Sequence, residues 1–141
     1  RDERGQWSAP LNLNDVDFDF YREDQTEDEF DNIAHQMMDA NVIVLATPVY
    51  FYSMSGQMKT LIDRMMPYFS QISHKDFYFI LTAPVNKKEM EPTAESLTGF
   101  TDCLNDCNVV HITYGANVSQ KGDIINKPAY KEVFDIASRI L

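Results

Sequence analysis

Cysteine is scarce in this sequence, and it contains neither a long apolar run nor an excess of basic charge. Two cysteines among 141 residues, Cys103 and Cys107, are too few for a disulfide scaffold. No apolar run reaches the roughly 20 residues that a membrane-spanning helix requires, and no signal-peptide pattern opens the chain. The sequence therefore predicts a protein of the reducing cytoplasm with no membrane partner.

The charge is strongly one-sided. The chain carries 22 acidic against 12 basic residues, a formal net charge of −10. Nucleic acids and anionic membranes require a basic face, so this balance argues against either partner. The length suits one domain, and a hydrophobic content of 44% is sufficient for a core.

The first 25 residues show no helical pattern and predict an irregular N-terminal arm. Within it, Asp15 to Tyr21 alternates apolar and acidic residues. This alternation is typical of a half-buried strand, but aspartate disfavours strands. Two alternatives stay open: a strand, or a solvated arm that docks its phenylalanines.

From residue 26 onward, helix and strand patterns alternate. A capping box at Thr26–Glu29 predicts a helix that ends near Asn41. Continuous apolar runs predict buried strands over 42–46, 77–82 and 109–114, with Pro48 and Pro84 ending the first two. Further helices are expected over 54–66, over 93–105 after a charged loop at 86–92, and from Pro128. This order predicts an α/β fold whose parallel sheet is covered on both faces.

The loop after the first strong strand is the leading candidate for a site. In open α/β sheets, ligands bind beyond the carboxyl ends of the strands. The loop at 47–53 carries Tyr50, Phe51 and Tyr52 in succession. These rings could meet a planar cofactor, or they could pack at a dimer interface while Ser53 only caps the next helix. The residues alone favour the interface.

A longer motif around this loop resembles a known family. The segment from Ala46 to Ser55, followed by Gln57-Met58-Lys59 and Ile62-Asp63-Arg64, is similar to the signature of NADPH-dependent FMN reductases. These are flavodoxin-like flavoproteins, close to the iron–sulfur flavoprotein and quinone-reductase branch. The turn at 121–124, followed by Pro128, resembles the last crossover of that family. The likeness covers about residues 26–141, taken here as the C-terminal portion of a flavodoxin-like domain.

The resemblance implies a flavodoxin-like three-layer sheet of strand order 2-1-3-4-5, in which the predicted strands are the third to fifth. It implies FMN as cofactor, NAD(P)H as electron donor, a quinone, flavin or similar small acceptor, and a homodimer. With the resemblance, contact with the flavin, and not packing at a dimer interface, becomes the favoured role of the loop at 47–53. The cofactor-binding residues that it implies are Thr47, Pro48, Val49, Tyr50, Phe51, Tyr52, Ser53, Thr82 and Ala83.

Parts of the family pattern are not found in this sequence. Residues 1–25 contain no phosphate loop, and no first strand or first helix precedes residue 26. The start at Arg1 favours a piece of a longer chain over a natural short form. No cysteine cluster precedes Cys103, so no metal site is expected, and Cys103 and Cys107 are interpreted as buried thiols. Because no catalytic acid, base or nucleophile is evident, a non-enzymatic interaction module and a flavodoxin-type electron carrier remain alternatives.

Overall fold

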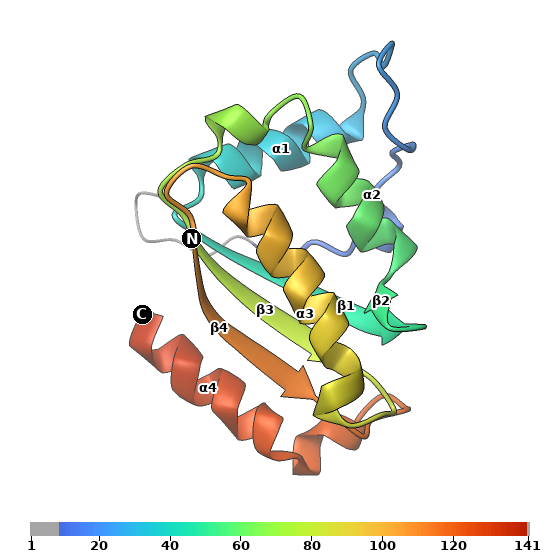
Figure 1. The fold of residues 1–141 in the computed structure, drawn as a ribbon, viewed down its shortest axis with the longest axis vertical. Coiled ribbons are helices and arrows are strands. Elements are labelled where there is room, and N and C mark those ends of the chain that lie inside the picture. Colours follow the sequence, from blue (N-terminus) through green and yellow to red (C-terminus); the bar gives the residue numbers. More distant parts are fainter. Residues whose placement is uncertain (1–8, 141) are drawn as a thin grey trace.

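Three apolar runs form the parallel part of the sheet. In the computed structural model, which describes residues 9–140, they are β1 (Val42–Tyr50), β3 (Asp76–Thr82) and β4 (Asn108–Gly115). The short strand β2 (Ser53–Met54) pairs antiparallel with β1, so the sheet order is β2-β1-β3-β4 (Figure 1). The adjacent parallel order of β1, β3 and β4 confirms the predicted flavodoxin-like α/β architecture.

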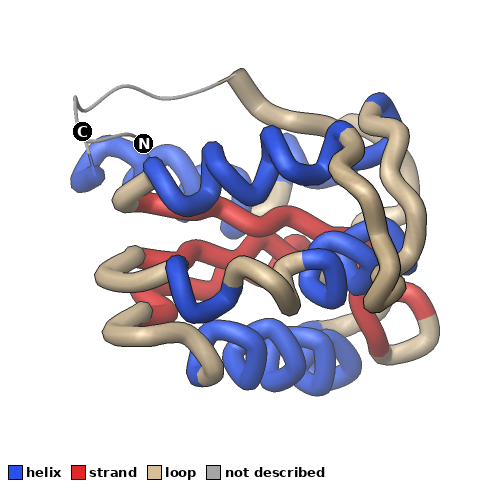
Figure 2. Tube along the Cα trace, turned by 90° about the horizontal axis from the view of Figure 1, so that it is seen from above, coloured by secondary structure: helices blue, strands red, loops and turns tan. Residues whose placement is uncertain are grey.

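Four α-helices complete the layers on the two sides of the sheet (Figure 2). They are α1 (Glu29–Asp39), α2 (Gly56–Arg64), α3 (Lys87–Asp102) and α4 (Pro128–Ile140). The first three bury apolar side chains in one core with β1 and β3. Its largest fully buried members include Phe30, Phe77, Phe79, Met65, Leu81 and Leu97. α4 packs against β4 and buries only Ala129 fully.

The second face of the sheet is only partly covered, which corrects the expectation for β1. Val44, Tyr78 and His111 are in register and share this face. The His111 ring lies 2.7 Å from the Glu132 carboxylate of α4, which places α4 over β4. Val44 is 42% exposed, whereas its neighbours Ile43 and Leu45 are buried. Within the described part of the chain, the sheet is therefore open over β1.

Two predicted boundaries around the first strand are wrong. β1 continues through Pro48 to Tyr50 instead of ending before the proline. Proline is tolerated here because β1 is paired along its length only with β3, and β2 reaches only Val49 and Tyr50 on the other edge. α2 then begins at Gly56 with Ser55 as its N-cap, so Ser53 belongs to a strand and caps no helix.

The starts of α1 and α3 also differ from the prediction. The capping box of α1 is formed by Asp28 and Asp31, two residues after the predicted one, and the helix ends at Asp39. α3 begins at Lys87, because Asn86 and Glu89 form a capping box within the stretch predicted as a loop. Pro92 lies inside α3, in its second turn, and does not start it.

The described part of the N-terminal segment, residues 9–28, is an arm without a strand. A short 3₁₀ turn, η1 (Leu13–Asp15), is its one helical element. Phe18 packs against Phe30 of α1 with ring centroids 5.5 Å apart, whereas Phe20 is 77% exposed. Residues 15–21 thus form the arm that was one of the two alternatives, docked through Phe18, and not the strand. The domain division at residue 26 stays a prediction.

The two cysteines are free thiols in different settings. Cys103 follows the last residue of α3 and is exposed, whereas Cys107 is half-buried. The expectation of two buried thiols is therefore wrong, because α3 ends at Asp102 and neither thiol lies on its core-facing side. Among the helices described here, none is long and apolar enough to cross a bilayer.

Candidate functional site at the carboxyl edge of the sheet

The carboxyl ends of the parallel strands bring three loops to one edge of the sheet (Figure 1). They follow β1 at 51–52, β3 at 83–86 and β4 at 116–122. The last two are joined by backbone hydrogen bonds: Ala83 N donates to Gly115 O at 3.1 Å, and Val118 N donates to Ala83 O at 3.0 Å. These two loops thus form one connected rim, with the β1 loop beyond it.

The loop after β1 is a tight hairpin with three exposed aromatic side chains. Tyr50 pairs with Ser53, which leaves Phe51 and Tyr52 as a two-residue turn. Both have left-handed backbone, with φ of 50° and 65°, as a type I′ turn requires. Tyr50, Phe51 and Tyr52 are 60%, 100% and 63% exposed. We call residues 50–53 the aromatic hairpin.

This hairpin conformation is costly for its residues. Left-handed backbone at a bulky residue costs on the order of 1–3 kcal/mol, and type I′ turns normally use asparagine and glycine. Because the three rings are exposed, their burial does not offset this free-energy cost. Strain of this kind is concentrated at binding and catalytic sites, so the aromatic hairpin is the leading candidate for a functional element.

The other predicted site residues are placed less uniformly. Thr47 and Val49 are 3% and 8% exposed, so their side chains face the core. Pro48 is half-buried, and Ser53 is exposed. Thr82 is half-buried at the end of β3. Ala83 is buried, and its N–H and C=O are both bonded to the β4 loop. The structure therefore presents residues 50–53 together, and holds Thr47, Val49 and Ala83 behind them.

Gly115, the last residue of β4, has a structural role that the sequence analysis did not identify. A Cβ atom at Gly115 would lie 3.0 Å from Ile124 Cδ1 and 3.0 Å from Thr82 Cγ2. Glycine therefore allows the segment that contains Ile124 to lie close to the end of β3, and a larger residue would require these side chains to shift. A glycine directly after an apolar strand was the available signal.

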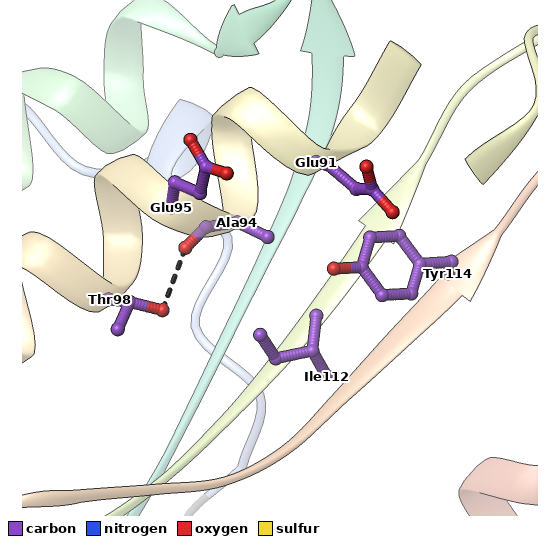
Figure 3. Close-up of a pocket in the computed structure, with 6 residues that line it drawn as sticks. All are labelled: Glu91, Ala94, Glu95, Thr98, Ile112 and Tyr114. Carbon is purple, nitrogen blue, oxygen red and sulfur yellow. Dashed lines mark hydrogen bonds between the residues drawn. The ribbon is translucent and has the colours of Figure 1, made fainter. Parts of the chain in front are cut away.

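A separate shallow groove of about 320 Å³ lies between α3 and β4 (Figure 3). Its lining is formed by Glu91, Ala94, Glu95, Thr98, Ile112 and Tyr114. Burial, followed by the two carboxylates, raises the pKa of Tyr114 above its ordinary value. The Thr98 hydroxyl donates to Ala94 O within its own helix. With two carboxylates at its rim, the groove disfavours anionic ligands such as phosphates.

The helix N-termini at the strand edge are already capped. The Ser55 hydroxyl accepts from Met58 N at 3.3 Å, and the Asn86 side chain accepts from Lys88 N at 3.0 Å. The structure thus offers exposed rings for a planar ring system, and one first-turn N–H at each of these two helix starts is already bonded to its cap. Residues 9–140 contain no group of three or more histidine, cysteine or acidic side chains placed to hold a metal ion.

The parallel order β1-β3-β4, with helices on both sides of the sheet, is that of a flavodoxin-like α/β fold. The chain belongs to the NADPH-dependent FMN reductase family, whose model matches residues 7–117. The motif at 46–64, which carries the resemblance in the sequence, lies within the matched range.

Two curated relatives match parts of the chain. An iron–sulfur flavoprotein of Archaeoglobus fulgidus is 35% identical over 65 residues, which cover 44% of this chain and 30% of the relative. A putative NAD(P)H-dependent FMN-containing oxidoreductase of Bacillus subtilis is 37% identical over 38 residues, covering 27% of this chain and 21% of the relative. The matches thus span less than a third of each relative.

Solved structures show the same fold over more of the chain. An FMN-dependent NADH-azoreductase from Bacillus anthracis, in complex with FMN, superposes with a TM-score of 0.69 at 16% identity, covering 92% of this chain and 79% of that one. The Trp repressor binding protein from Bacillus subtilis superposes with a TM-score of 0.64 at 23% identity, covering 79% and 75%. At these identities, the likeness establishes the fold.

Proposed function

We propose that this chain forms the ring-binding part of an FMN-dependent NAD(P)H oxidoreductase. Electrons would pass from the nicotinamide to a quinone, a flavin or a similar small acceptor. Membership of the NADPH-dependent FMN reductase family supports the reaction class. The observation that carries the proposal is the aromatic hairpin, which exposes three rings at the strand edge where ligands of such sheets bind.

The residues of the chain would bind and orient the ring. The hydride chemistry belongs to the flavin when it is bound, and the protein supplies position and surroundings. Tyr50 and Tyr52 offer ring faces for stacking, and Ser53 offers an exposed hydroxyl beside them. Thr82 lies at the end of the neighbouring strand. Thr47, Val49 and Ala83 would support this wall from behind. Because residues 1–25 contain no phosphate loop, the proposal is limited to the ring.

A homodimer is the assembly that we propose. Phe51 is fully exposed at the tip of the hairpin, and a second copy packed there would cover it. We propose the cytoplasm as the compartment, in keeping with two free thiols.

One observation favours a second candidate function, a non-enzymatic interaction module. Residues 1–25 contain no phosphate loop of the family's type, and one first-turn N–H at the start of each of α2 and α3 is already bonded to its cap. A chain that cannot hold FMN could still use the aromatic hairpin to bind another protein. Colour distinguishes the two candidates, because a flavin complex absorbs in the visible range and a bare protein does not.

The test is a titration of the purified protein with FMN, followed by absorbance and fluorescence. We expect binding that weakens when Tyr50→Ala and Phe51→Ala are combined, without loss of the thermal transition. Phe20→Ala is the matched control, since Phe20 is an exposed ring on the arm. A protein that takes up no FMN would contradict the flavin proposal and favour the interaction module. In a yellow protein, bleaching by NADPH alone would favour a reductase over an electron carrier.

A further inference from the structure

The aromatic hairpin is fastened to the sheet by very little backbone pairing. β1 and β2 share only two residue pairs, Val49 with Met54 and Tyr50 with Ser53. A two-stranded hairpin of this size is marginal by itself, and its two turn residues have unfavourable backbone conformations. Something besides the ladder must therefore hold the rings at the strand edge.

The burial of Met54 in the core, at 6% exposed, is one such connection, and the Thr47 hydroxyl provides a second. Its Oγ1 accepts a hydrogen bond from Ser55 N at 3.0 Å and donates one to Pro48 O at 2.9 Å. Ser55 is the first residue after β2, so this contact joins the strand before the hairpin to the chain that leaves it. Thr47 is 3% exposed and Ser55 is 8% exposed, so water does not compete for the bond.

The same contact extends into α2. The Ser55 hydroxyl caps this helix by accepting from Met58 N, and Met58 is 4% exposed in the core. A continuous series of hydrogen bonds therefore runs from β1 through Thr47 and Ser55 to the first turn of α2. The hairpin is the only segment between the two ends of this series that lies outside the core.

We propose that Thr47 is a positioning residue for the aromatic hairpin. Its hydroxyl fixes the return of the chain at Ser55, and so holds Tyr50 and Tyr52 in the orientation in which they meet a planar ring. The inference that this orientation serves ring binding rests on the proposed function. The hydroxyl itself is turned inward and contacts no ligand.

Thr47→Val tests this role, because valine keeps the shape of threonine and removes the hydroxyl. We expect the Ser55 amide to exchange with solvent about tenfold faster in the ligand-free variant, and FMN affinity to fall about tenfold. Thr47→Ser restores the hydroxyl, so both quantities should return to within about twofold of the parent protein. An unchanged Ser55 exchange rate, or an unchanged affinity in a protein that binds FMN, would overturn the proposal.

Thr60→Val is the matched control. Thr60 is also a buried threonine, and its hydroxyl donates to Gly56 O within α2 at 2.8 Å, away from the hairpin. Its loss should change global stability without changing Ser55 exchange or FMN affinity. Equal effects of Thr60→Val and Thr47→Val on these two quantities would reduce Thr47 to a general stabilising residue and contradict the proposal.

A second pair of variants tests the contact if Thr47→Val does not fold. Thr47→Ala and Thr47→Ser both lack the threonine methyl group and differ only in the hydroxyl that accepts from Ser55 N. We expect Thr47→Ala to bind FMN about tenfold more weakly than Thr47→Ser. Equal affinities would overturn the proposal. If the parent protein binds no FMN, the proposed function fails, and Ser55 exchange still decides the role of Thr47.

Discussion

Arg64, the last residue of α2, and Asp28, the N-cap of α1, form a bidentate ion pair. Arg64 Nη1 lies 2.8 Å from Asp28 Oδ2, and Nη2 lies 2.7 Å from Oδ1. The guanidinium also donates to Asp19 O of the arm and lies 4.7 Å from the centroid of the Phe30 ring. One buried side chain thus connects the arm, α1 and α2.

Loss of Arg64 should be strongly destabilising. Arg64 is 4% exposed, and Arg64→Ala leaves the Asp28 carboxylate without its charged partner, so we expect a loss of about 3 kcal/mol in the free energy of unfolding. Urea denaturation measures this. Lys59→Ala is the control, because Lys59 pairs with Asp63 on the exposed side of the same helix and should cost less than about 0.5 kcal/mol. Similar losses in the two variants would show that the buried Arg64–Asp28 pair contributes no more to stability than the exposed Lys59–Asp63 pair.

Acid should destabilise the protein through the same cluster. The hydrogen bond from Arg64 lowers the pKa of Asp28, and the hydrogen bond from Tyr68 lowers the pKa of Asp31. Carboxylates with depressed pKa in the folded state stabilise it above the unfolded value of 3.8, and this contribution is lost as the pH falls through the folded values. Unfolding at pH 2–6 should show this loss. In Asp28→Asn with Asp31→Asn, the dependence should be shallower, and a profile as steep as the parent's would exclude this origin.

Tyr68 should titrate at high pH. Its hydroxyl donates to the Asp31 carboxylate, which together with burial raises the pKa of Tyr68 to about 12. The stabilisation that this raised pKa represents is present below about pH 10 and is lost as the pH rises through 12. Phenolate absorbance should show a step near pH 12 that disappears in Tyr68→Phe. Asp31→Asn should move this step to lower pH, and a step that persists in Tyr68→Phe would assign it elsewhere.

Two glycines should respond oppositely to alanine. Gly115→Ala places a Cβ 3.0 Å from Ile124 Cδ1 and Thr82 Cγ2, so we expect a loss of about 1 kcal/mol that Ile124→Val partly restores. Gly99 lies inside α3 with nothing within 4 Å of the position that a Cβ would take, so Gly99→Ala should gain about 1 kcal/mol. Thermal denaturation of both variants provides the comparison. Stabilisation by Gly115→Ala would show that the loops do not need close approach.

The sequence predicted the elements whose signals are local and strong. Continuous apolar runs located the three parallel strands, and Pro128 marked the first residue of α4. The helix starts were misplaced where several residues could cap. Asp28 is the cap of α1, although Thr26 and Glu29 fit the motif equally well, and tertiary contact with Arg64 decides between them.

The candidate site was predictable in location but not in detail. An aromatic loop after a parallel strand pointed to the carboxyl edge of the sheet. The inward placement of Thr47 and Val49 could not be predicted, because Pro48 was expected to end β1, and the alternation of faces in fact continues to Tyr50. Nothing local in the sequence signals that Phe51 and Tyr52 adopt left-handed backbone, a conformation that bulky residues rarely adopt.

Selection of this protein for thermal stability alone would act against the turn at residues 51 and 52. Asn-Gly is the favoured pair for such a turn, so a screen for heat resistance should select Phe51→Asn with Tyr52→Gly. The selected chains would melt later and would have lost two of the three rings that the strand edge presents. Selection for stability and selection for ligand binding would thus oppose each other at two adjacent residues.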